Sequence, residues 1–286
     1  MRIVAACLSI AVLAVGCAKE SPPPDDAAVE AARARSALPT TTPSNVPGTP
    51  VPAISEPPAL VKNAIYGAGK LAPSGCADPA GELTALAEVR AYYLKLVACL
   101  NKAWAPPVRK AGFAFKAPQL VVTVGHSPDS TCDAPDGQLY YCRGTIYMDA
   151  RVDIDYDKED RAANRALMVF FIAHEYAHHI QALTGIQKVK DARDETLNGV
   201  DIQLQETRRI ELQADCFSGA FAASVRKTFP IDDAWVETWS ATYDDFSPMD
   251  DTHGLGATRR IWSLKGFTVG DLRACNTFAA APGELR

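Results

Sequence analysis

The sequence predicts an α+β domain with a small sheet and two long helices that face each other. Residues 119–124 are rich in β-branched side chains, and two further short strands are expected around Arg143-Gly144. Helical patterns follow, the longest over residues 165–183 and 201–227. Because the strands precede the helices and do not alternate with them, their order favours α+β and not a repeat of βαβ units.

The remaining elements follow from periodicity and from residues that interrupt it. Apolar side chains recur at helical spacing over residues 82–104, and Pro106-Pro107 is expected to end that helix. Gly185 is expected to end the first long helix. The other expected elements are a hairpin or bulged turn joining 139–142 to 145–148, a loop or broken helix over 186–200, and short helices over 235–243 and 257–264.

The N-terminal residues predict export. After Met1-Arg2, residues 3–15 form an apolar run that is too short to cross a bilayer but has the length of a signal-peptide core. The segment Ala14-Val15-Gly16-Cys17 resembles the bacterial lipoprotein processing site, where the cysteine becomes the lipidated first residue. Cleavage by ordinary signal peptidase and an uncleaved anchor are the alternatives. We therefore expect a signal peptide over residues 1–16 and a membrane anchor at Cys17.

A segment rich in Pro, Ala and Thr follows the signal peptide. We expect residues 17–74 to form a disordered tether, because this composition, clearest up to about residue 61, buries too little apolar surface to offset the entropy of ordering. The folded domain is expected over residues 75–280, with a short tail over 281–286. The formal net charge is −5, and no basic stripe with interleaved aromatic residues occurs, so nucleic acid is not an expected partner.

Six cysteines lie in the part that is expected to be exported, and an even number in that setting predicts disulfides. Cys132 and Cys142 flank a turn-rich segment that favours a local bridge. A second local bridge is suggested because one cysteine lies just before the helix that carries the next. The expected pairs are Cys76–Cys99, Cys132–Cys142 and Cys216–Cys275. A cysteine zinc site is not expected, since no C-x2-C spacing occurs.

The chemistry is expected at His174-Glu175-x-x-His178 in the first long helix. Positions i and i+4 share a helix face, so both imidazoles can reach one metal ion. Glu175 is turned slightly aside, where it can meet a water bound to that metal. The alternative is a buried helix with incidental histidines. The pattern predicts a hydrolytic site with one zinc ion.

A catalytic zinc needs a third protein ligand, and the second long helix carries Glu211 and Asp215 at i and i+4. We expect Glu211 to bind the metal and Asp215 to accept a hydrogen bond from a ligand histidine, which fixes its tautomer. This is the zincin-like (mini-gluzincin) arrangement, in which two antiparallel helices face each other across the ion. A solvated acidic face is the alternative, but the small apolar residues after Asp215 predict burial. Glu206 is the reserve ligand.

Several motifs occur in a fixed order along the chain. They are His174-Glu175-Tyr176-Ala177-His178-His179-Ile180-Gln181, Glu211-Leu212-Gln213-Ala214-Asp215-Cys216-Phe217-Ser218-Gly219, His253-Gly254, Gly266-Phe267, Gly270-Asp271 and Cys275-Asn276-Thr277-Phe278. Together they resemble the putative neutral zinc metallopeptidase family of bacteria, over about residues 132–278. The family usually has Gly in place of Ala177, and Gln-Arg where Thr258-Arg259 or Arg259-Arg260 stands. The resemblance implies a zinc peptidase and leaves its substrate open.

The expected reaction is hydrolysis of a peptide or protein substrate outside the cytoplasm. Glu175 is expected to act as the general base and then to protonate the leaving amine. His253 is the expected stabiliser of the oxyanion, with Tyr176 and Tyr243 in reserve; a structural or surface role is the alternative for His253. His179 is expected to be structural. The remaining histidine, His126, is expected at the surface near a strand end.

Two other function classes use the same residues. A binding or scaffolding lipoprotein could keep zinc for structure alone, but such a closed site has no use for a general base such as Glu175. An amidase acting on cell-wall peptides would use the same metal chemistry. In a peptidase or an amidase, the edge of the hairpin that ends near Met148 is the expected binding place for an extended peptide.

Overall fold

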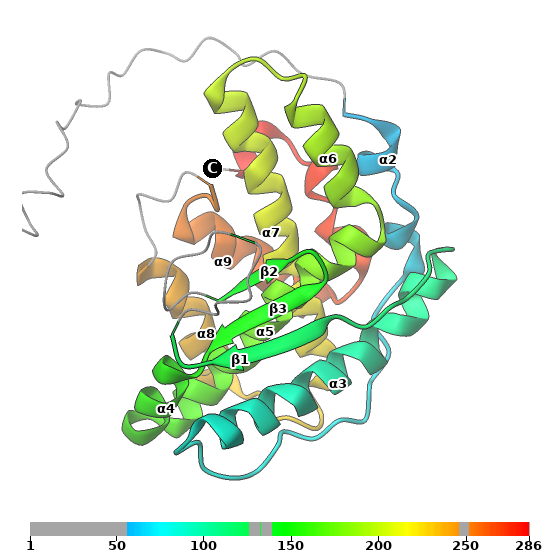
Figure 1. The fold of residues 1–286 in the computed structure, drawn as a ribbon. Helices are drawn as coiled ribbons and strands as arrows, with labels where there is room; N and C mark the ends of the chain where they lie inside the picture. The colour runs from blue at the N-terminus through cyan, green and yellow to red at the C-terminus, as the bar shows by residue number, and fades with distance from the viewer. Residues whose placement is uncertain (1–55, 126–131, 133–138, 246–251, 286) are drawn as a thin grey trace, which may run out of the picture. The chain divides into compact units, whose positions relative to one another are not determined.

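The computed structural model describes residues 56–125, 132, 139–245 and 252–285. The expected signal peptide, Cys17 and His126 lie outside these residues. The described part is mainly helical with one small sheet (Figure 1), which confirms the α+β class. Its elements are α2 (Pro58–Val61), η1 (Ala64–Ala68), α3 (Leu86–Lys110), β1 (Gln119–Thr123), β2 (Tyr140–Cys142), β3 (Thr145–Asp149), α4 (Ala150–Glu159), α5 (Arg161–Leu183), α6 (Ile186–Asp194), α7 (Val200–Val225), α8 (Asp233–Asp245), α9 (Gly256–Val269), η2 (Leu272–Cys275), η3 (Thr277–Ala279) and η4 (Pro282–Leu285).

The sheet has three strands in the order β1–β3–β2. β1 is parallel to β3, and β2 pairs antiparallel with β3 to form the expected hairpin. At its turn, Arg143 and Gly144 have φ values of 44° and 95°, the left-handed conformation that a tight hairpin turn requires. β2 is therefore an edge strand, and it packs beside α5. Within the described residues, no helix has both the length and the apolar character to cross a membrane.

α3 continues past the prolines that were expected to end it. Pro106 and Pro107 both lie inside the helix. A proline in a helix interior costs about 3 kcal/mol, because it removes a hydrogen bond and crowds the preceding turn. Trp104 and Val108, on either side of the prolines, are almost fully buried. Burying such side chains contributes about 1.5–3 kcal/mol each, which offsets a large part of that cost.

α5 and α7 are the two long helices, and they run antiparallel. Asp160 is the N-cap of α5, and its carboxylate accepts a hydrogen bond from the backbone N–H of Ala163. Gly185 follows the end of the helix with φ of 75°. In the first half of α5, the Phe170 carbonyl accepts a hydrogen bond from the Ser218 hydroxyl at 3.0 Å. Near its end, other contacts reach the first half of α7, so residue numbers rise along one helix and fall along the other.

α9 is longer than expected because it contacts α7 through glycines. A Cβ on Gly266 would lie 1.9 Å from the carbonyl oxygen of Cys216, and a Cβ on Gly219 would lie 2.1 Å from that of Ser263. Only glycine permits this approach of two helix backbones. Gly266 is therefore a packing residue inside α9 and does not end the helix.

Residues 56–74 belong to the folded unit, so the expected start of the domain at residue 75 was wrong. Leu60 and Ile65 in this segment are 0 % exposed. The side-chain amide of Asn276 donates to the carbonyl of Val61 at 2.8 Å. The few apolar residues of this segment are buried because the C-terminal part of the chain packs against them. The rest of the expected tether lies outside the described residues.

The C-terminal residues also pack against the domain. Leu285 is buried, and the Trp262 indole donates to the carbonyl of Glu284 at 2.9 Å, so the expected tail over 281–286 is part of the fold as far as residue 285. The disulfides join Cys76 to Cys99, Cys132 to Cys142 and Cys216 to Cys275, the three pairs that the sequence predicts. The last of these ties η2 to α7.

Candidate metal centre

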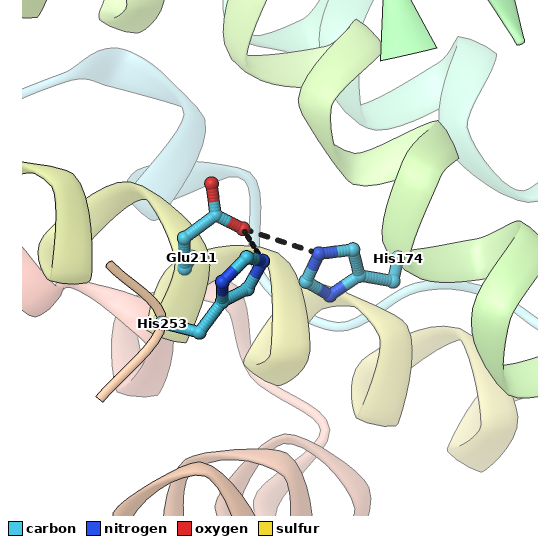
Figure 2. A group of neighbouring side chains, drawn as sticks. All are labelled: His174, Glu211 and His253. Carbon is cyan, nitrogen blue, oxygen red and sulfur yellow. Dashed lines mark ion pairs between the residues drawn. The ribbon is translucent and has the colours of Figure 1, made fainter. Parts of the chain in front are cut away.

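Three histidines, two from α5 and one from the segment before α9, converge on one carboxylate oxygen of Glu211 in α7. Glu211 Oε2 lies 3.3 Å from His174 Nε2 and 3.2 Å from His178 Nε2. It also lies 3.3 Å from His253 Nε2. Figure 2 shows His174 and His253 pointing at Glu211 from two sides, and these three offer ligand atoms within 4.8 Å of one another. The structure thus brings together the ligands expected from sequence and the expected oxyanion stabiliser.

The chemistry of this donor set fits a metal ion. His174 Nδ1 lies 2.8 Å from Asp215 Oδ1, and His178 Nδ1 lies 2.8 Å from Gln181 Oε1. Because these oxygens accept hydrogen bonds, each Nδ1 carries a hydrogen and each Nε2 is left to bind a cation. The two Nε2 atoms are 3.2 Å apart, and both face the Glu211 carboxylate. Because two nitrogen lone pairs and a carboxylate repel one another at this distance, a positive charge between them stabilises the group. Two imidazoles and a carboxylate are a ligand set of catalytic zinc sites.

Asp215 holds His174 from a fully buried position and is itself held by Arg259. Arg259 Nε donates to Asp215 Oδ2 at 2.9 Å, and a terminal nitrogen donates to Oδ1 at 3.2 Å. Burial by itself would raise the pKa of Asp215, but Arg259 and His174 lower it to about 2. Burial would lower the pKa of His174, but Asp215 above all raises it to about 10. Asp215 is therefore ionised and accepts the hydrogen on His174 Nδ1, which leaves Nε2 facing Glu211.

Arg259 is the residue of this site that sequence reasoning missed. The helix that carries it was identified, but no role was assigned to its arginines. The sequence did contain one indication of a role for Arg259, because the family usually has a Gln-Arg pair at Thr258-Arg259 or Arg259-Arg260. What could not be read from the sequence is that Arg259 faces α7 and reaches Asp215, 44 residues away in the chain.

Glu175 lines the same cleft as the three histidines and Glu211. The cleft has a volume of about 490 Å³, and its other walls come from β2 and from α6 and the first half of α7. Burial raises the pKa of Glu175, although His174 and His178 oppose this. A carboxylate with a raised pKa is a better proton acceptor near neutral pH. Its place in the cleft wall suits the role of general base.

Tyr176 and Tyr243 do not line the cleft, so their expected reserve role at the oxyanion was wrong. The Tyr176 hydroxyl donates to Asn101 Oδ1 at 2.7 Å, towards α3. Tyr243 is buried and lies edge-on to Phe170, 5.4 Å between ring centres. The reason for Tyr176 is helical geometry, since a residue two positions after His174 points to the opposite side of α5.

Glu206 and His179 are structural. Glu206 is buried and forms ion pairs with Arg209 at 3.3 Å and Arg193 at 3.4 Å, so it is not a reserve ligand. His179 Nε2 lies 2.7 Å from the carbonyl of Lys116, and burial lowers the pKa of His179. The contacts of His179 agree with the structural role expected for it.

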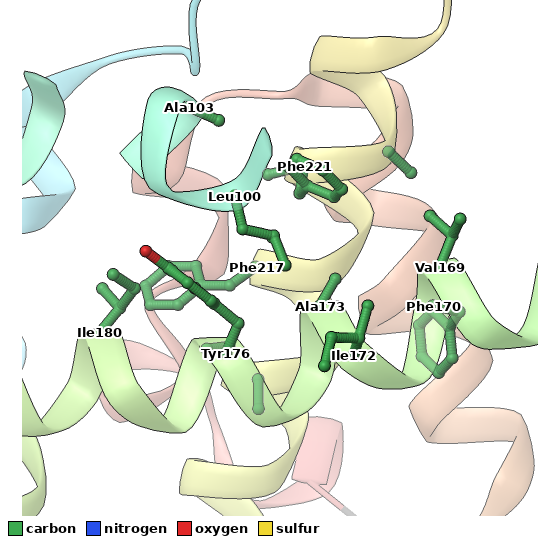
Figure 3. Packing of buried hydrophobic residues seen from close by; sticks show 14 of the residues in the cluster. Leu100, Ala103, Val169, Phe170, Ile172, Ala173, Tyr176, Ile180, Phe217 and Phe221 are labelled. Atoms are coloured by element: carbon green, nitrogen blue, oxygen red, sulfur yellow. The ribbon is translucent and has the colours of Figure 1, made fainter. Parts of the chain in front are cut away.

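The faces of α5 and α7 that point away from the cleft are anchored in the core (Figure 3). Ile172 and Tyr176 of α5, Phe217 and Phe221 of α7, and Leu100 of α3 are all fully buried. Side chains buried in a close-packed core have little freedom to shift. The metal-facing residues therefore stand on helices that are held from behind, as a site with defined geometry requires.

Comparison with known proteins gives a family and uncharacterised relatives. A family model described as putative neutral zinc metallopeptidase matches residues 75–278. The uncharacterized protein YpfJ of Escherichia coli is 29% identical over 201 residues, which cover 64% of this chain and 69% of the relative. The uncharacterized protein Rv2575 of Mycobacterium tuberculosis is 31% identical over 137 residues, 39% of this chain and 44% of the relative. No solved structure matches the chain significantly.

Proposed function

Because the chain belongs to the putative neutral zinc metallopeptidase family, we propose that it hydrolyses peptide bonds outside the cytoplasm. The observation that carries the proposal is the convergence of His174, His178 and Glu211 in one cleft with Glu175. The antiparallel pairing of α5 and α7 around these residues supports a zincin-like site. Glu175 argues against a zinc-binding scaffold without activity, since a structural zinc needs no general base.

The chain's own residues divide the work of hydrolysis. A zinc ion held by His174, His178 and Glu211 would act as a Lewis acid and would lower the pKa of bound water towards about 7. Glu175 takes a proton from the attacking water and passes it to the leaving amine. His253, which lines the same cleft from the segment before α9, stabilises negative charge on the substrate oxygen.

The substrate is proposed to be an extended peptide segment. Tyr140, Tyr141 and Cys142 of the edge strand β2 line the cleft beside Glu175. An edge strand can pair with an added strand through backbone hydrogen bonds, which gives affinity with little dependence on side chains. The hairpin expected from sequence to hold the substrate is therefore in a suitable place.

The enzyme is proposed to work at a membrane surface in the cell envelope. Three disulfides are typical of proteins that fold in an oxidising compartment. A lipid on Cys17 would hold the domain at the membrane. Nucleic acid is not a proposed partner. Mass spectrometry of the mature protein tests this part, since an unmodified N-terminus at another residue would contradict lipidation.

The activity is tested by comparing the wild type with Glu175→Gln. We expect the variant to bind one zinc ion per chain, as the wild type does, and to hydrolyse casein about 10²–10⁴-fold more slowly, because it lacks the general base. Glu195→Gln, on the exposed surface, is the matched control and is expected to keep full activity. Equal turnover in the wild type and Glu175→Gln would refute the proposal. The same variants assayed on peptidoglycan fragments distinguish a peptidase from a cell-wall amidase.

A further inference from the structure

We propose that Gln181 and Gln213 form an uncharged relay that orients His178 for metal binding. It would do for His178 what Asp215 does for His174. The relay rests on the proposed role of His178 as a ligand, but its geometry is independent of any activity. Both glutamines belong to the sequence motifs described above, and neither has a role in the proposed reaction.

The orientation of the Gln181 amide follows from its neighbours. Gln181 Nε2 lies 2.8 Å from the carbonyl oxygen of Ile210, and a carbonyl can only accept a hydrogen bond. The NH₂ end of the amide must therefore face Ile210. Its oxygen then faces His178 Nδ1, at 2.8 Å. An amide oxygen accepts, so His178 must carry its hydrogen on Nδ1 and present Nε2 to the metal.

Gln213 fixes Gln181 in turn. Gln181 Nε2 donates its second hydrogen to Gln213 Oε1 at 3.2 Å. Gln213 Nε2 donates to the carbonyl of Cys275 at 3.2 Å and to the Tyr66 hydroxyl at 2.7 Å. The Cys275 carbonyl leaves only one orientation for this second amide, as the Ile210 carbonyl does for the first. If either amide were turned over, its oxygen would face a backbone carbonyl oxygen, and two acceptors would then be in contact.

Burial makes this order strict. Gln181 and Gln213 are both 0 % exposed, so water cannot replace a lost partner. Burying two amides is costly unless their hydrogen bonds are satisfied, and core packing alone does not call for them. A neutral partner also suits this side of the site. Glu175, Glu211 and Asp215 already bring three carboxyl groups to the metal centre, and an amide adds no further charge.

The relay connects the metal centre to both ends of the described chain. Tyr66 lies in η1, within the segment that the sequence predicted to be outside the domain. Cys275 lies in η2 and is bonded through its sulfur to α7. Residues that are far from the site in sequence therefore set the direction of a metal ligand.

The first test measures His178 in the wild-type protein by ¹H–¹⁵N NMR of the imidazole. We expect a slowly exchanging hydrogen on His178 Nδ1, with and without zinc, because Gln181 shields it from water. Absence of that hydrogen, or its rapid exchange with solvent, would overturn the proposal. This measurement needs no variant and no enzymatic activity, so it separates failure of the relay from failure of the proposed function.

The second test removes the acceptor with Gln181→Met, which has nearly the same length and no amide. Zinc affinity, measured by competition with a chromophoric chelator, is expected to fall about 10–100-fold, the range seen when a partner of a metal ligand is lost. The Nδ1 hydrogen of His178 should then exchange rapidly. Gln213→Met acts one step further away and is expected to cause a smaller loss.

Gln203→Met, an exposed glutamine on the same helix as Gln213, is the control and is expected to bind zinc as the wild type does. Circular dichroism and the melting temperature of the metal-free proteins show which variants are folded. Folded Gln181→Met that binds zinc as tightly as the control would overturn the proposal. If neither buried variant folds, the wild-type NMR measurement decides.

Discussion

His174 and His178 differ in the side chains that hold them. His174 donates to an ionised carboxylate that is paired with Arg259, and His178 donates to an amide. A carboxylate partner makes an imidazole more basic and a stronger metal ligand, whereas an amide mainly fixes its direction. At the scale of the residue, these partners decide how the predicted ligands present their nitrogens.

Replacing Arg259 tests the ion pair through which Asp215 holds His174. In Arg259→Gln, Asp215 is left buried without its guanidinium partner, which we expect to cost about 3–5 kcal/mol of stability, as loss of one partner in a buried ion pair does. Zinc affinity should fall about tenfold or more, because Asp215 no longer holds His174 as firmly. Chemical denaturation of the metal-free protein and chelator competition measure the two effects.

The neighbouring Arg260 provides the control for this change. Its ion pair with Glu237 is at the surface, at 3.1 Å, and exposed pairs contribute about 0–1 kcal/mol. Arg260→Gln should therefore leave stability and zinc affinity nearly unchanged. Equal effects of the two substitutions would contradict the role given to Arg259.

α7 carries Glu211, the proposed third ligand, and the position of this helix depends on its close contact with α9. Gly266 and Gly219 let the two backbones approach, and the disulfide from Cys216 holds the same part of α7. Arg259 lies two turns before Gly266 on α9. At the scale of the element, the glycine contact brings α9 close enough to α7 for Arg259 to reach Asp215.

Gly266→Ala is expected to destabilise the protein strongly. The added Cβ would lie 1.9 Å from the backbone oxygen of Cys216, so the helices must separate. Overpacking costs about 1–3 kcal/mol, and we expect at least the upper end because backbone cannot move aside as a side chain can. Gly283→Ala, where nothing lies within 4 Å, is the control. Similar melting temperatures for both variants would show that α7 and α9 are not in tight contact.

α4 carries Asp153, a buried carboxyl group whose loss of a proton lowers the stability of the fold as the pH rises. Burial raises the pKa of Asp153 to about 7 from an ordinary 3.8, although the Tyr93 hydroxyl donates to it. The folded protein binds this proton more tightly than the unfolded chain does. The stabilisation is therefore present below about pH 4 and is lost as the pH rises through about 7.

Asp153→Asn removes this titration and can still accept from Tyr93. Between about pH 4 and pH 7, the free energy of unfolding of the wild type should fall relative to that of the variant by on the order of 3 kcal/mol, at about 1.4 kcal/mol per pKa unit. Urea denaturation across this pH range measures the difference. A constant difference between the two proteins would mean that Asp153 titrates normally.

At the scale of the whole described domain, the N-terminal and C-terminal segments hold each other. Gly69 accepts a backbone hydrogen bond from Leu272, and Asn276 donates to the carbonyl of Val61. Both segments also contribute partners to Gln213. The domain is therefore built around α5 and α7 from residues at both of its ends.

Two shortened chains test the limit of the domain. A chain that starts at residue 56 keeps Leu60 and Ile65, which are 0 % exposed, and a chain that starts at residue 75 lacks them. Each buried side chain contributes about 1.5–3 kcal/mol, so the shorter chain should be less stable by at least about 3 kcal/mol. It should also bind zinc more weakly. Equal stability of the two chains would restore the expected start at residue 75.

The sequence was sufficient for features that depend on spacing along the chain. The i, i+4 spacing of His174 and His178 places them on one helix face wherever that helix lies. Period and composition likewise predicted the hairpin, the long helices and the α+β class. The same kind of spacing pointed to Glu211 and Asp215, which the structure places beside His174.

Other features depend on contacts between residues that are far apart in the chain, and only the tertiary structure decided them. Arg259 reaches Asp215, Gln213 reaches Tyr66 and Cys275, and the prolines of α3 are tolerated because their neighbours are buried. Residues 56–74 fold for the same reason, since their few apolar side chains gain stability only against a surface made by the rest of the chain. Periodicity reports which side of an element is buried, but it does not report which residue lies opposite.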